Sequence, residues 1–334
     1  MQKVAIIGKQ QPLKVRQMIK EYLEENGLLA DILYMETRYA PDWTDKLKGY
    51  NAIISAGEKF PAVVFEELAG DLKLLSRYGV GTDEIDKAKA AECGVAVCNA
   101  AGSLSTAVAE CAMALILSLL RSIPRSDSEV RNNDWSRFFE SKTGTQIEGK
   151  TVGIIGFGDI SKALAKMLSG FGCNIIAYDL FWDEKTAEKL GVKYATIEEI
   201  QENADIISIH VPSTPETNGM INAEFLSKCK RNAILINTAR GRLVVAQDLA
   251  DALNNDIIAG AGMDVFFPEP PEPDNPLLTA KNTILLPHTG ACTIESHIKA
   301  GMMAAKNVAD FFNGKEVKTI LNPEYKNNLR GDKK

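Results

Sequence analysis

A glycine-rich turn in the middle of the chain constrains the fold more strongly than any other feature. The segment Thr151–Ser161 (TVGIIGFGDIS) reads as a buried strand, a turn with two glycines and the start of a helix. Gly156 permits the tight turn, and Gly158 has no side chain to keep a ligand away from the backbone. The helix that begins here directs unpaired N–H groups toward negative charge. Together these features predict a binding site for the pyrophosphate of a dinucleotide.

A carboxylate follows at the spacing that such a site requires. A second apolar run, Asn174–Tyr178, ends in Asp179, which can accept hydrogen bonds from the adenosine ribose hydroxyls. Its charge would repel a 2′-phosphate, so the sequence predicts NAD rather than NADP. Two residues depart from the fingerprint: Ser161 replaces the third glycine, and Asp159 brings a carboxylate close to the expected pyrophosphate. We expect a small helix shift to accommodate Ser161. Asp159 should turn toward solvent, since otherwise the cofactor affinity would fall.

Apolar runs alternate with helical segments over most of the chain, which predicts mostly parallel, doubly wound sheets with helices on both faces. A chain of 334 residues exceeds the usual size of one core, so this α/β protein should contain two domains. Helical periodicity marks Lys14–Glu25 and Ala62–Leu68. The predicted strands outside the glycine-rich unit are Val4–Ile7, Ala30–Tyr34, Ala52–Ser55, Leu72–Ser76, Val95–Cys98, Asp205–His210, Ala233–Asn237, Ile257–Asp264 and Thr283–Leu286.

Two longer helices organise the predicted domains. The helix over Ala107–Leu120 has almost no polar face, so we expect it to be a core helix between the domains and part of a subunit interface. A helix over Ile294–Phe312 would return the chain, so that the C-terminal tail packs on the first domain. The prediction is a discontinuous, flavodoxin-like substrate domain of residues 1–102 and 294–334. A dinucleotide-binding Rossmann domain of residues 103–293 would face it across a cleft.

Composition excludes several functional classes. The net charge of −6 argues against nucleic acid as a partner, because that requires a basic surface. The six cysteines form no C-x-x-C pair and no zinc-like pattern with histidine, so we expect free thiols, no disulfides and no metal. The chain opens directly with a predicted strand rather than a signal sequence, and its longest apolar stretch is too short to span a bilayer. A cytoplasmic protein is expected.

Three histidines are available for proton transfer. His288 follows the apolar run 285–287 in a glycine-containing turn, which places it on a loop at a strand end. His210 ends another predicted strand, near the expected cofactor, and His297 lies within a predicted helix, where a structural role is favoured. An isolated histidine is more often structural than catalytic, so the context of His288 matters.

Two further charged residues lie in distinctive surroundings. Arg240 ends an apolar strand between two small residues that leave room for a ligand, although a solvated surface arginine is the alternative. Glu269 lies in a rigid proline-rich loop, Pro268–Pro276, just past a strand end where α/β proteins bind ligands. Taken alone, it is one of many glutamates.

These candidates lie in motifs that resemble those of the D-isomer-specific 2-hydroxyacid dehydrogenases, a family that includes phosphoglycerate dehydrogenases and glyoxylate/hydroxypyruvate reductases. The motifs are NTARG around Arg240, DVFFPEPP around Glu269 and PHTGA around His288. The resemblance covers most of the chain in family order. It extends to Arg77–Asp86, Ala107–Glu110, His210–Thr217, Ile258–Asp264 and Asn322–Glu324.

The resemblance implies a role for each catalytic candidate. His288 would donate the proton to the substrate carbonyl oxygen while NADH delivers hydride to the carbon. Glu269 would hydrogen-bond the other imidazole nitrogen, and Arg240 would bind the substrate carboxylate and carbonyl oxygen through its planar fork. The backbone N–H groups of Val80 and Gly81 would bind the same carboxylate from the substrate domain.

The resemblance also implies which residues bind NAD. Asp264 and the backbone of Thr238 and Ala239 would hold the nicotinamide carboxamide. A further departure from the family, Ala101 in place of a proline, loosens a turn near the hinge. The full predicted set is Gly156, Gly158, Asp159, Ile160, Asp179, His210, Val211, Pro212, Thr217, Thr238, Ala239, Arg240, Asp264, His288 and Gly290.

The sequence thus predicts an NAD-dependent oxidoreductase that interconverts a D-2-hydroxyacid and its 2-ketoacid. The alternative is a catalytically weak NAD(H)-sensing binding protein like the corepressors that resemble this family. Retention of the three catalytic candidates favours an enzyme, although corepressors can keep them too. Because the chain ends at Lys334, we expect no added regulatory domain. A homodimer, or a dimer of dimers, is expected.

The identity of the 2-hydroxyacid stays open. A phosphorylated substrate would require extra cations, for which Arg77 and the segment Arg131–Arg137 are candidates, the segment possibly from a neighbouring subunit. Solvated charge on a loop is the alternative for both.

Overall fold

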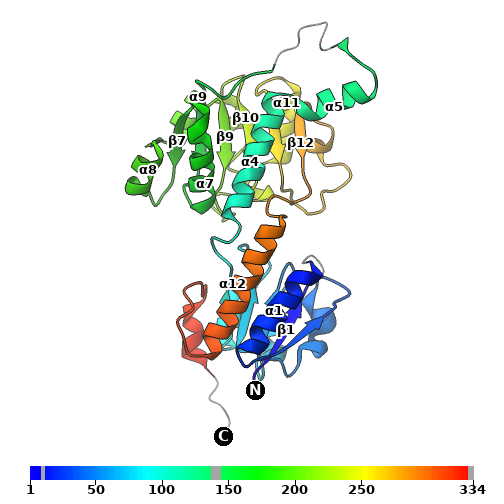
Figure 1. The fold of residues 1–334 in the computed structure, drawn as a ribbon. Coiled ribbons are helices and arrows are strands. Elements are labelled where there is room, and N and C mark those ends of the chain that lie inside the picture. The colour runs from blue at the N-terminus through cyan, green and yellow to red at the C-terminus, as the bar shows by residue number, and fades with distance from the viewer. Residues whose placement is uncertain (9–11, 137–143, 330–334) are drawn as a thin grey trace. The chain divides into compact units, whose positions relative to one another are not determined.

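The computed structural model describes residues 1–8, 12–136 and 144–329, and the chain divides into two compact units (Figure 1). Unit 1 consists of Met1–Leu104 together with Cys292–Lys334, and unit 2 is the continuous stretch Ser105–Ala291. Each unit contains one parallel sheet with helices on both faces, so the predicted α/β class is confirmed.

The sheet of unit 1 has five strands in the order β2-β1-β3-β4-β5, which is the flavodoxin-like order. All neighbouring strands are parallel, and in the register of β1 and β3 Ile6 lies opposite Ile54. Each strand overlaps one of the apolar runs predicted in this part of the chain. The strands are β1 (Lys3–Ile7), β2 (Leu29–Leu33), β3 (Ala52–Ser55), β4 (Leu74–Arg77) and β5 (Ala96–Cys98).

Helices cover both faces of this sheet because successive residues of the buried strands point to opposite sides. On one side α1 (Leu13–Glu25) packs against α12 (Ile294–Phe312), with Ile19 and Val308 in the shared core. The other side holds an aromatic core in which Phe60 contacts both Trp43 and Phe65. The elements there are η1 (Ala40–Leu47), α2 (Ala62–Leu68) and α3 (Lys87–Glu92).

A buried asparagine fixes the C-terminal tail to unit 1. Asn322 precedes the short helix η5 (Pro323–Asn328) and is only 1% exposed. Its Oδ1 accepts a hydrogen bond from the Val97 N–H (2.8 Å), and its Nδ2 donates to the carbonyl oxygens of Val95 (3.0 Å) and Lys87 (3.3 Å). The tail therefore packs on the first part of the chain, as the sequence predicts.

We expect Asn322→Ala to lower the free energy of unfolding by about 2–4 kcal/mol, because it leaves several buried polar groups without partners. Urea unfolding at neutral pH measures this loss. Asn327→Ala removes an exposed asparagine from the same short helix and should change the free energy of unfolding little. Equal stability of the two variants would show that the Asn322 side chain does not hold the tail.

The sheet of unit 2 has seven parallel strands in the order β12-β11-β10-β9-β6-β7-β8. The strand order reverses between β6 and β9, which is where doubly wound sheets bind dinucleotides. The strand β11 begins at Gly260, three residues later than predicted, because the Ile257 N–H returns to the Ala252 carbonyl at the preceding helix end. The strands are β6 (Thr151–Ile155), β7 (Asn174–Tyr178), β8 (Val192–Tyr194), β9 (Ile206–Ile209), β10 (Ile234–Asn237), β11 (Gly260–Met263) and β12 (Thr283–Leu285).

Two helical layers enclose this sheet. On one face α4 (Ser105–Leu120) packs on α7 (Asp159–Leu168) and on β10 to β12, so the nearly all-apolar helix is a core helix of unit 2. The opposite face is covered by α9 (Ile197–Asn203), α10 (Ala223–Ser227) and α11 (Ala246–Asn254). The remaining elements are α5 (Ile123–Arg131), α8 (Glu184–Leu190), η2 (Ser169–Phe171), η3 (Gly241–Leu243) and η4 (Pro276–Leu278).

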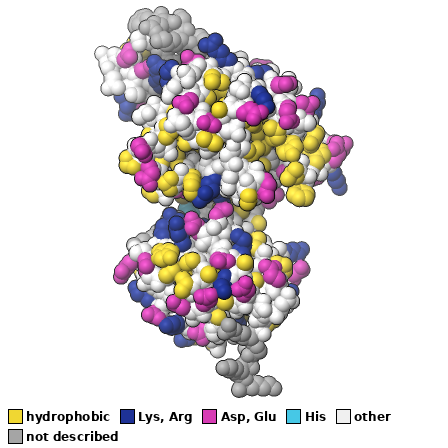
Figure 2. Space-filling model, turned by 180° about the vertical axis from the view of Figure 1, so that it is seen from behind, with side chains coloured by type: hydrophobic (Ala, Val, Ile, Leu, Met, Phe, Trp, Pro, Cys, Tyr) yellow, Lys and Arg dark blue, Asp and Glu magenta, His cyan; other side chains and the backbone are white. Residues whose placement is uncertain are grey.

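Figure 2 shows acidic and basic side chains interspersed over one face of both units, in keeping with 38 basic and 44 acidic residues. Within the described ranges, no single helix has the length and apolar character to cross a bilayer. Only α4 and α5 taken together reach that length, and they are bent by 59°. The six cysteines are all free.

Candidate functional site

The glycine-rich turn joins β6 to α7 at the strand-order reversal. Gly156 has φ +92°, and a Cβ there would lie 2.7 Å from the His210 carbonyl oxygen, so only glycine fits. A Cβ on Gly158 would meet nothing within 4 Å, which leaves open space in front of the turn. The N–H groups of Asp159 and Ile160 have no hydrogen-bond partner among the described residues. An open turn lined by such donors fits a pyrophosphate.

The carboxylate after β7 is tied to this turn. Asp179 accepts hydrogen bonds from the Phe157 N–H (2.5 Å) and the Phe181 N–H (2.7 Å), which fix its orientation. Ser161 is fully buried and donates to the Gly156 carbonyl (2.5 Å), so the residue that replaces the third glycine stabilises the turn. Asp159 is exposed in the first turn of α7, in keeping with the expectation that it faces solvent.

Two buried polar atoms lie without partners on neighbouring strand ends. In the register of β9 and β10, Ile209 lies opposite Asn237, so His210 and Thr238 follow side by side. The Nε2 of His210 lies 2.8 Å from Ser208 Oγ, but its Nδ1 and the Oγ1 of Thr238 are buried and unpartnered. Buried polar atoms are normally hydrogen-bonded, so this edge fits a ligand with polar groups such as a dinucleotide.

A histidine and a carboxylate from two different loops form a hydrogen-bonded pair at this edge. His288 Nδ1 lies 2.7 Å from Glu269 Oε2, and Glu269 Oε1 accepts from the Phe266 N–H (3.0 Å). Burial alone would raise the pKa of Glu269. The hydrogen bonds from His288 and Phe266 and the nearby charges of His288 and Arg240 outweigh burial and hold the Glu269 pKa below its ordinary value. The carboxylate is therefore ionised near neutral pH and can accept a hydrogen bond from the Nδ1–H of His288.

Asp264, after β11, holds the loop that carries His288. Its carboxylate accepts hydrogen bonds from the Thr289 N–H (2.7 Å) and the Gly290 N–H (2.8 Å), while its carbonyl accepts from the His288 N–H (2.7 Å). Burial raises the pKa of Asp264, and the two N–H donors offset part of that rise. These bonds hold His288 at φ +55°, a conformation that is rare for residues other than glycine.

Arg240 follows the end of β10 and is half-buried. Its Nη1 donates a hydrogen bond to the carbonyl oxygen of Ala239 (2.7 Å). The next residue, Gly241, packs against the backbone of Phe266, whose N–H binds Glu269, and the Arg240 charge helps to lower the Glu269 pKa. The three catalytic candidates therefore lie together within unit 2. Thr217 differs from the other candidates, because its hydroxyl donates to the Pro212 carbonyl (2.7 Å) and holds its own turn.

All predicted cofactor residues of unit 2 follow the carboxyl ends of its parallel strands, so they lie at one edge of the sheet. Gly156 to Ile160 follow β6, Asp179 follows β7, and the others follow β9 to β12. This is the edge where doubly wound sheets bind ligands. The role of Phe266 was not predicted from the sequence. Its backbone N–H binds Glu269, and no residue type signals a backbone contact. No set of three or more His, Cys, Asp or Glu in the described parts could hold a metal ion.

Unit 1 contains a separate loop with free backbone donors. Val80 and Gly81 follow β4, and their carbonyls accept from Asn99 Nδ2 (2.9 Å) and Arg77 Nε (2.9 Å). Their own N–H groups have no hydrogen-bond partner in the part of unit 1 that the structure describes. Arg77 also donates through Nη1 to the Ser55 carbonyl (3.3 Å), so it holds this loop in place.

Comparisons with known proteins identify the family. The model for the NAD-binding domain of the D-isomer specific 2-hydroxyacid dehydrogenases matches residues 113–290. A glyoxylate reductase of Korarchaeum cryptofilum is 37% identical over 283 residues, which cover 84% of this chain and 85% of that protein. This chain belongs to the D-isomer specific 2-hydroxyacid dehydrogenase family. The family resemblance of the sequence motifs and the prediction of NAD are therefore confirmed.

Other relatives in the family agree with this assignment. A D-3-phosphoglycerate dehydrogenase of Archaeoglobus fulgidus is 34% identical over 302 residues, which cover 90% of this chain and 56% of that protein. The chain thus spans about half the length of the phosphoglycerate dehydrogenase relatives that it matches. Among solved structures, an NAD-dependent formate dehydrogenase from Staphylococcus aureus in complex with NAD matches with a TM-score of 0.81 and 28% identity. The match covers 96% of this chain and 98% of that chain, which confirms the two Rossmann-like units.

The burial of the His210 imidazole generates a pH-dependent stability. Burial lowers the pKa of His210 to about 4, from an ordinary value of 6.5. Between these values the unfolded chain binds a proton that the folded site excludes, so stability falls as the pH drops from about 6.5 to about 4. The loss should reach about 3 kcal/mol. Urea unfolding of the wild type and of His210→Gln across this range measures it. Identical pH dependence of the two proteins would contradict it.

Proposed function

We propose that this protein is an NAD-dependent oxidoreductase that interconverts a D-2-hydroxyacid and its 2-ketoacid. The hydrogen-bonded pair of Glu269 and His288 carries the proposal, because it lies in a unit that belongs to an NAD-binding domain family. Arg240 supplies a cation at the same edge. A proton carrier, its carboxylate partner and an anion-binding guanidinium are the groups that hydride transfer to a 2-ketoacid requires from the protein.

His288 acts as the proton donor in the reductive direction. Its Nδ1–H donates to the ionised Glu269, so the protonated ring presents its Nε2–H to the substrate carbonyl oxygen. The carboxylate stabilises the imidazolium and fixes the ring orientation. NADH, when bound at this edge, would supply the hydride. In the oxidative direction Nε2 takes the hydroxyl proton.

Arg240 binds the substrate carboxylate and the carbonyl oxygen. Its guanidinium can donate two parallel hydrogen bonds to neighbouring oxygens, which orients the ketoacid and polarises its carbonyl group. In unit 1, the unpartnered N–H groups of Val80 and Gly81 form a small anion-binding loop suited to a carboxylate. We assign unit 1 as the substrate domain and unit 2 as the cofactor domain on these grounds.

The chemical nature of the substrate beyond its 2-ketoacid group follows from the available cations. Arg77 already holds the Val80–Gly81 loop, and Arg131 pairs with Asp127 (2.8 Å) on α5. Arg137 lies outside the described residues. Since the two described cations have internal partners, we propose a small unphosphorylated ketoacid such as glyoxylate as the better substrate.

The activity test compares glyoxylate, hydroxypyruvate and pyruvate reduction by NADH with 3-phosphoglycerate oxidation by NAD. We expect turnover of the small ketoacids in wild type. His288→Ala should reduce kcat by roughly 10²–10⁴-fold while NADH affinity persists, because only the proton donor is lost. Glu269→Gln should lower kcat by a smaller factor. NADH binding without turnover of any of these acids would contradict the proposal and would favour an NAD(H)-sensing protein.

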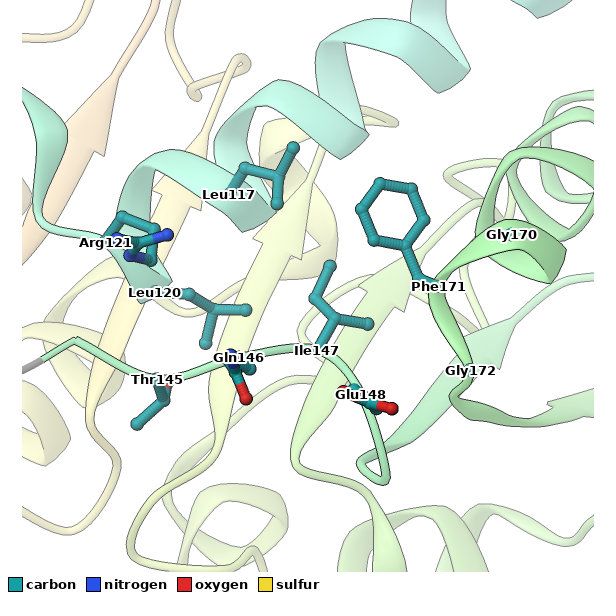
Figure 3. A pocket seen from close by; sticks show the side chains of 10 residues that line it. All are labelled: Leu117, Leu120, Arg121, Thr145, Gln146, Ile147, Glu148, Gly170, Phe171 and Gly172. Carbon is teal, nitrogen blue, oxygen red and sulfur yellow. The ribbon is translucent and has the colours of Figure 1, made fainter.

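We further propose that the protein is a cytoplasmic homodimer. Helix α5 has no buried residue, and Ile123, Val130 and Trp135 are each about half exposed. A nine-residue helix without a buried face is not stable alone. A second copy of the chain that packs on α5 would bury these apolar side chains. Beside the end of α4, the apolar side chains of Leu117, Leu120, Ile147 and Phe171 line a cavity of about 530 Å³ (Figure 3).

Light scattering after size exclusion should give twice the chain mass of 36.4 kDa. Phe171→Asp places a charge beside the apolar side chains of this cavity and should weaken the dimer, whereas Ile257→Asp changes a similarly exposed residue elsewhere on unit 2 and should not. A wild type that runs as a monomer would refute the dimer.

A further inference from the structure

The loop that carries Arg240 packs closely against the loop that carries Glu269 at Gly241. A Cβ placed on Gly241 would lie 2.6 Å from Phe266 Cα and closer still to the Phe266 carbonyl group. The neighbouring atoms are backbone, so they cannot move aside without moving the loop. The φ angle of Gly241 is not left-handed, so this position requires glycine for space rather than for conformation.

Phe266 is also the residue that holds Glu269. Its N–H donates to Glu269 Oε1 (3.0 Å), and Glu269 Oε2 in turn binds His288 Nδ1 (2.7 Å). The backbone of Phe266 therefore contacts Gly241 through its carbonyl side and the catalytic pair through its N–H. Any displacement of Phe266 changes the position of the carboxylate that orients His288.

The next residue on each loop adds a second contact. The Arg242 guanidinium carbon lies 3.3 Å from the centroid of the Phe267 ring, a cation–π stack between two exposed side chains. Such a stack at an exposed site contributes about 0.5–1 kcal/mol. The Arg242 carbonyl accepts a hydrogen bond from the Gly219 N–H (2.8 Å), which fixes its backbone to the body of unit 2.

We propose that Gly241 and Arg242, with Phe266 and Phe267, form a loop clamp that sets the position of Glu269 relative to Arg240. This proposal rests on the proposed function and names positioning residues for it; none of the four donates a side-chain group to the substrate. The clamp joins the anion-binding loop after β10 to the proton-transfer pair after β11 and β12. A shift of about 1 Å at such a site can cost on the order of 10²-fold in rate.

Two variants test the clamp in the full-length protein. Gly241→Ala should lower kcat on the order of 10²-fold with NADH affinity retained, because it displaces Glu269. Arg242→Ala should lower kcat about two- to fivefold, as expected for loss of the stack. Gly70→Ala, at a glycine with nothing within 4 Å of its Cβ, and Arg231→Ala, at an exposed arginine, are the matched controls and should behave as wild type.

Two readouts separate positioning from a general structural effect. In the Glu269→Gln background, Gly241→Ala and Arg242→Ala should cause much smaller further losses, since they act through Glu269. By NMR, the His288 Nδ1–H resonance, assigned by its change in Glu269→Gln, should shift or broaden in Gly241→Ala and stay unchanged in Gly70→Ala. The second readout requires no turnover.

The outcomes are distinct. Wild-type rates and an unshifted His288 resonance in both clamp variants would overturn the clamp, as would losses that multiply with that of Glu269→Gln. A wild type that turns over no 2-ketoacid, yet whose His288 resonance responds to Gly241→Ala, would overturn the proposed function and leave the clamp supported.

Discussion

The hydrogen bond between Glu269 and His288 is the interaction on which the account of this protein depends. It joins two loops that are 19 residues apart in sequence and that follow different strands of the same parallel sheet. Its strength depends on an ionised carboxylate, and the low pKa of Glu269 provides that state at neutral pH. Asp264 accepts hydrogen bonds from the backbone of the histidine loop, so Glu269 holds the imidazole and Asp264 holds the loop that carries it.

The parallel sheet explains why these loops meet. The carboxyl ends of parallel strands share one edge of the sheet. Residues that are far apart in the sequence of unit 2 are therefore brought together there. Where the strand order reverses, Gly156 packs against the His210 carbonyl, and the space in front of Gly158 is open for a dinucleotide. Fold and chemistry therefore depend on the same few glycines, at Gly156 for the cofactor and at Gly241 for the catalytic loops.

Most of the fold could be predicted from the sequence, because buried strands such as Ala52–Ser55 and helices such as Ile294–Phe312 carry strong local patterns. The site candidates followed from motif resemblance. Contacts made by backbone atoms could not be predicted, because residue identity does not report them: the Phe266 N–H on Glu269 is an example. Ser161 is a second example: a small helix shift was expected to accommodate it, and its hydroxyl also donates to the Gly156 carbonyl oxygen, a backbone contact.

The most direct test of the central claim follows a label from cofactor to product. NADH that carries deuterium at both C4 positions of its nicotinamide ring is consumed with hydroxypyruvate or pyruvate, whose reduction products are chiral, and the product is analysed for configuration and isotope content. Direct transfer at the site of Arg240, Glu269 and His288 predicts a D-2-hydroxyacid with one deuterium at C2. An L-product, or a product without deuterium, would contradict the account.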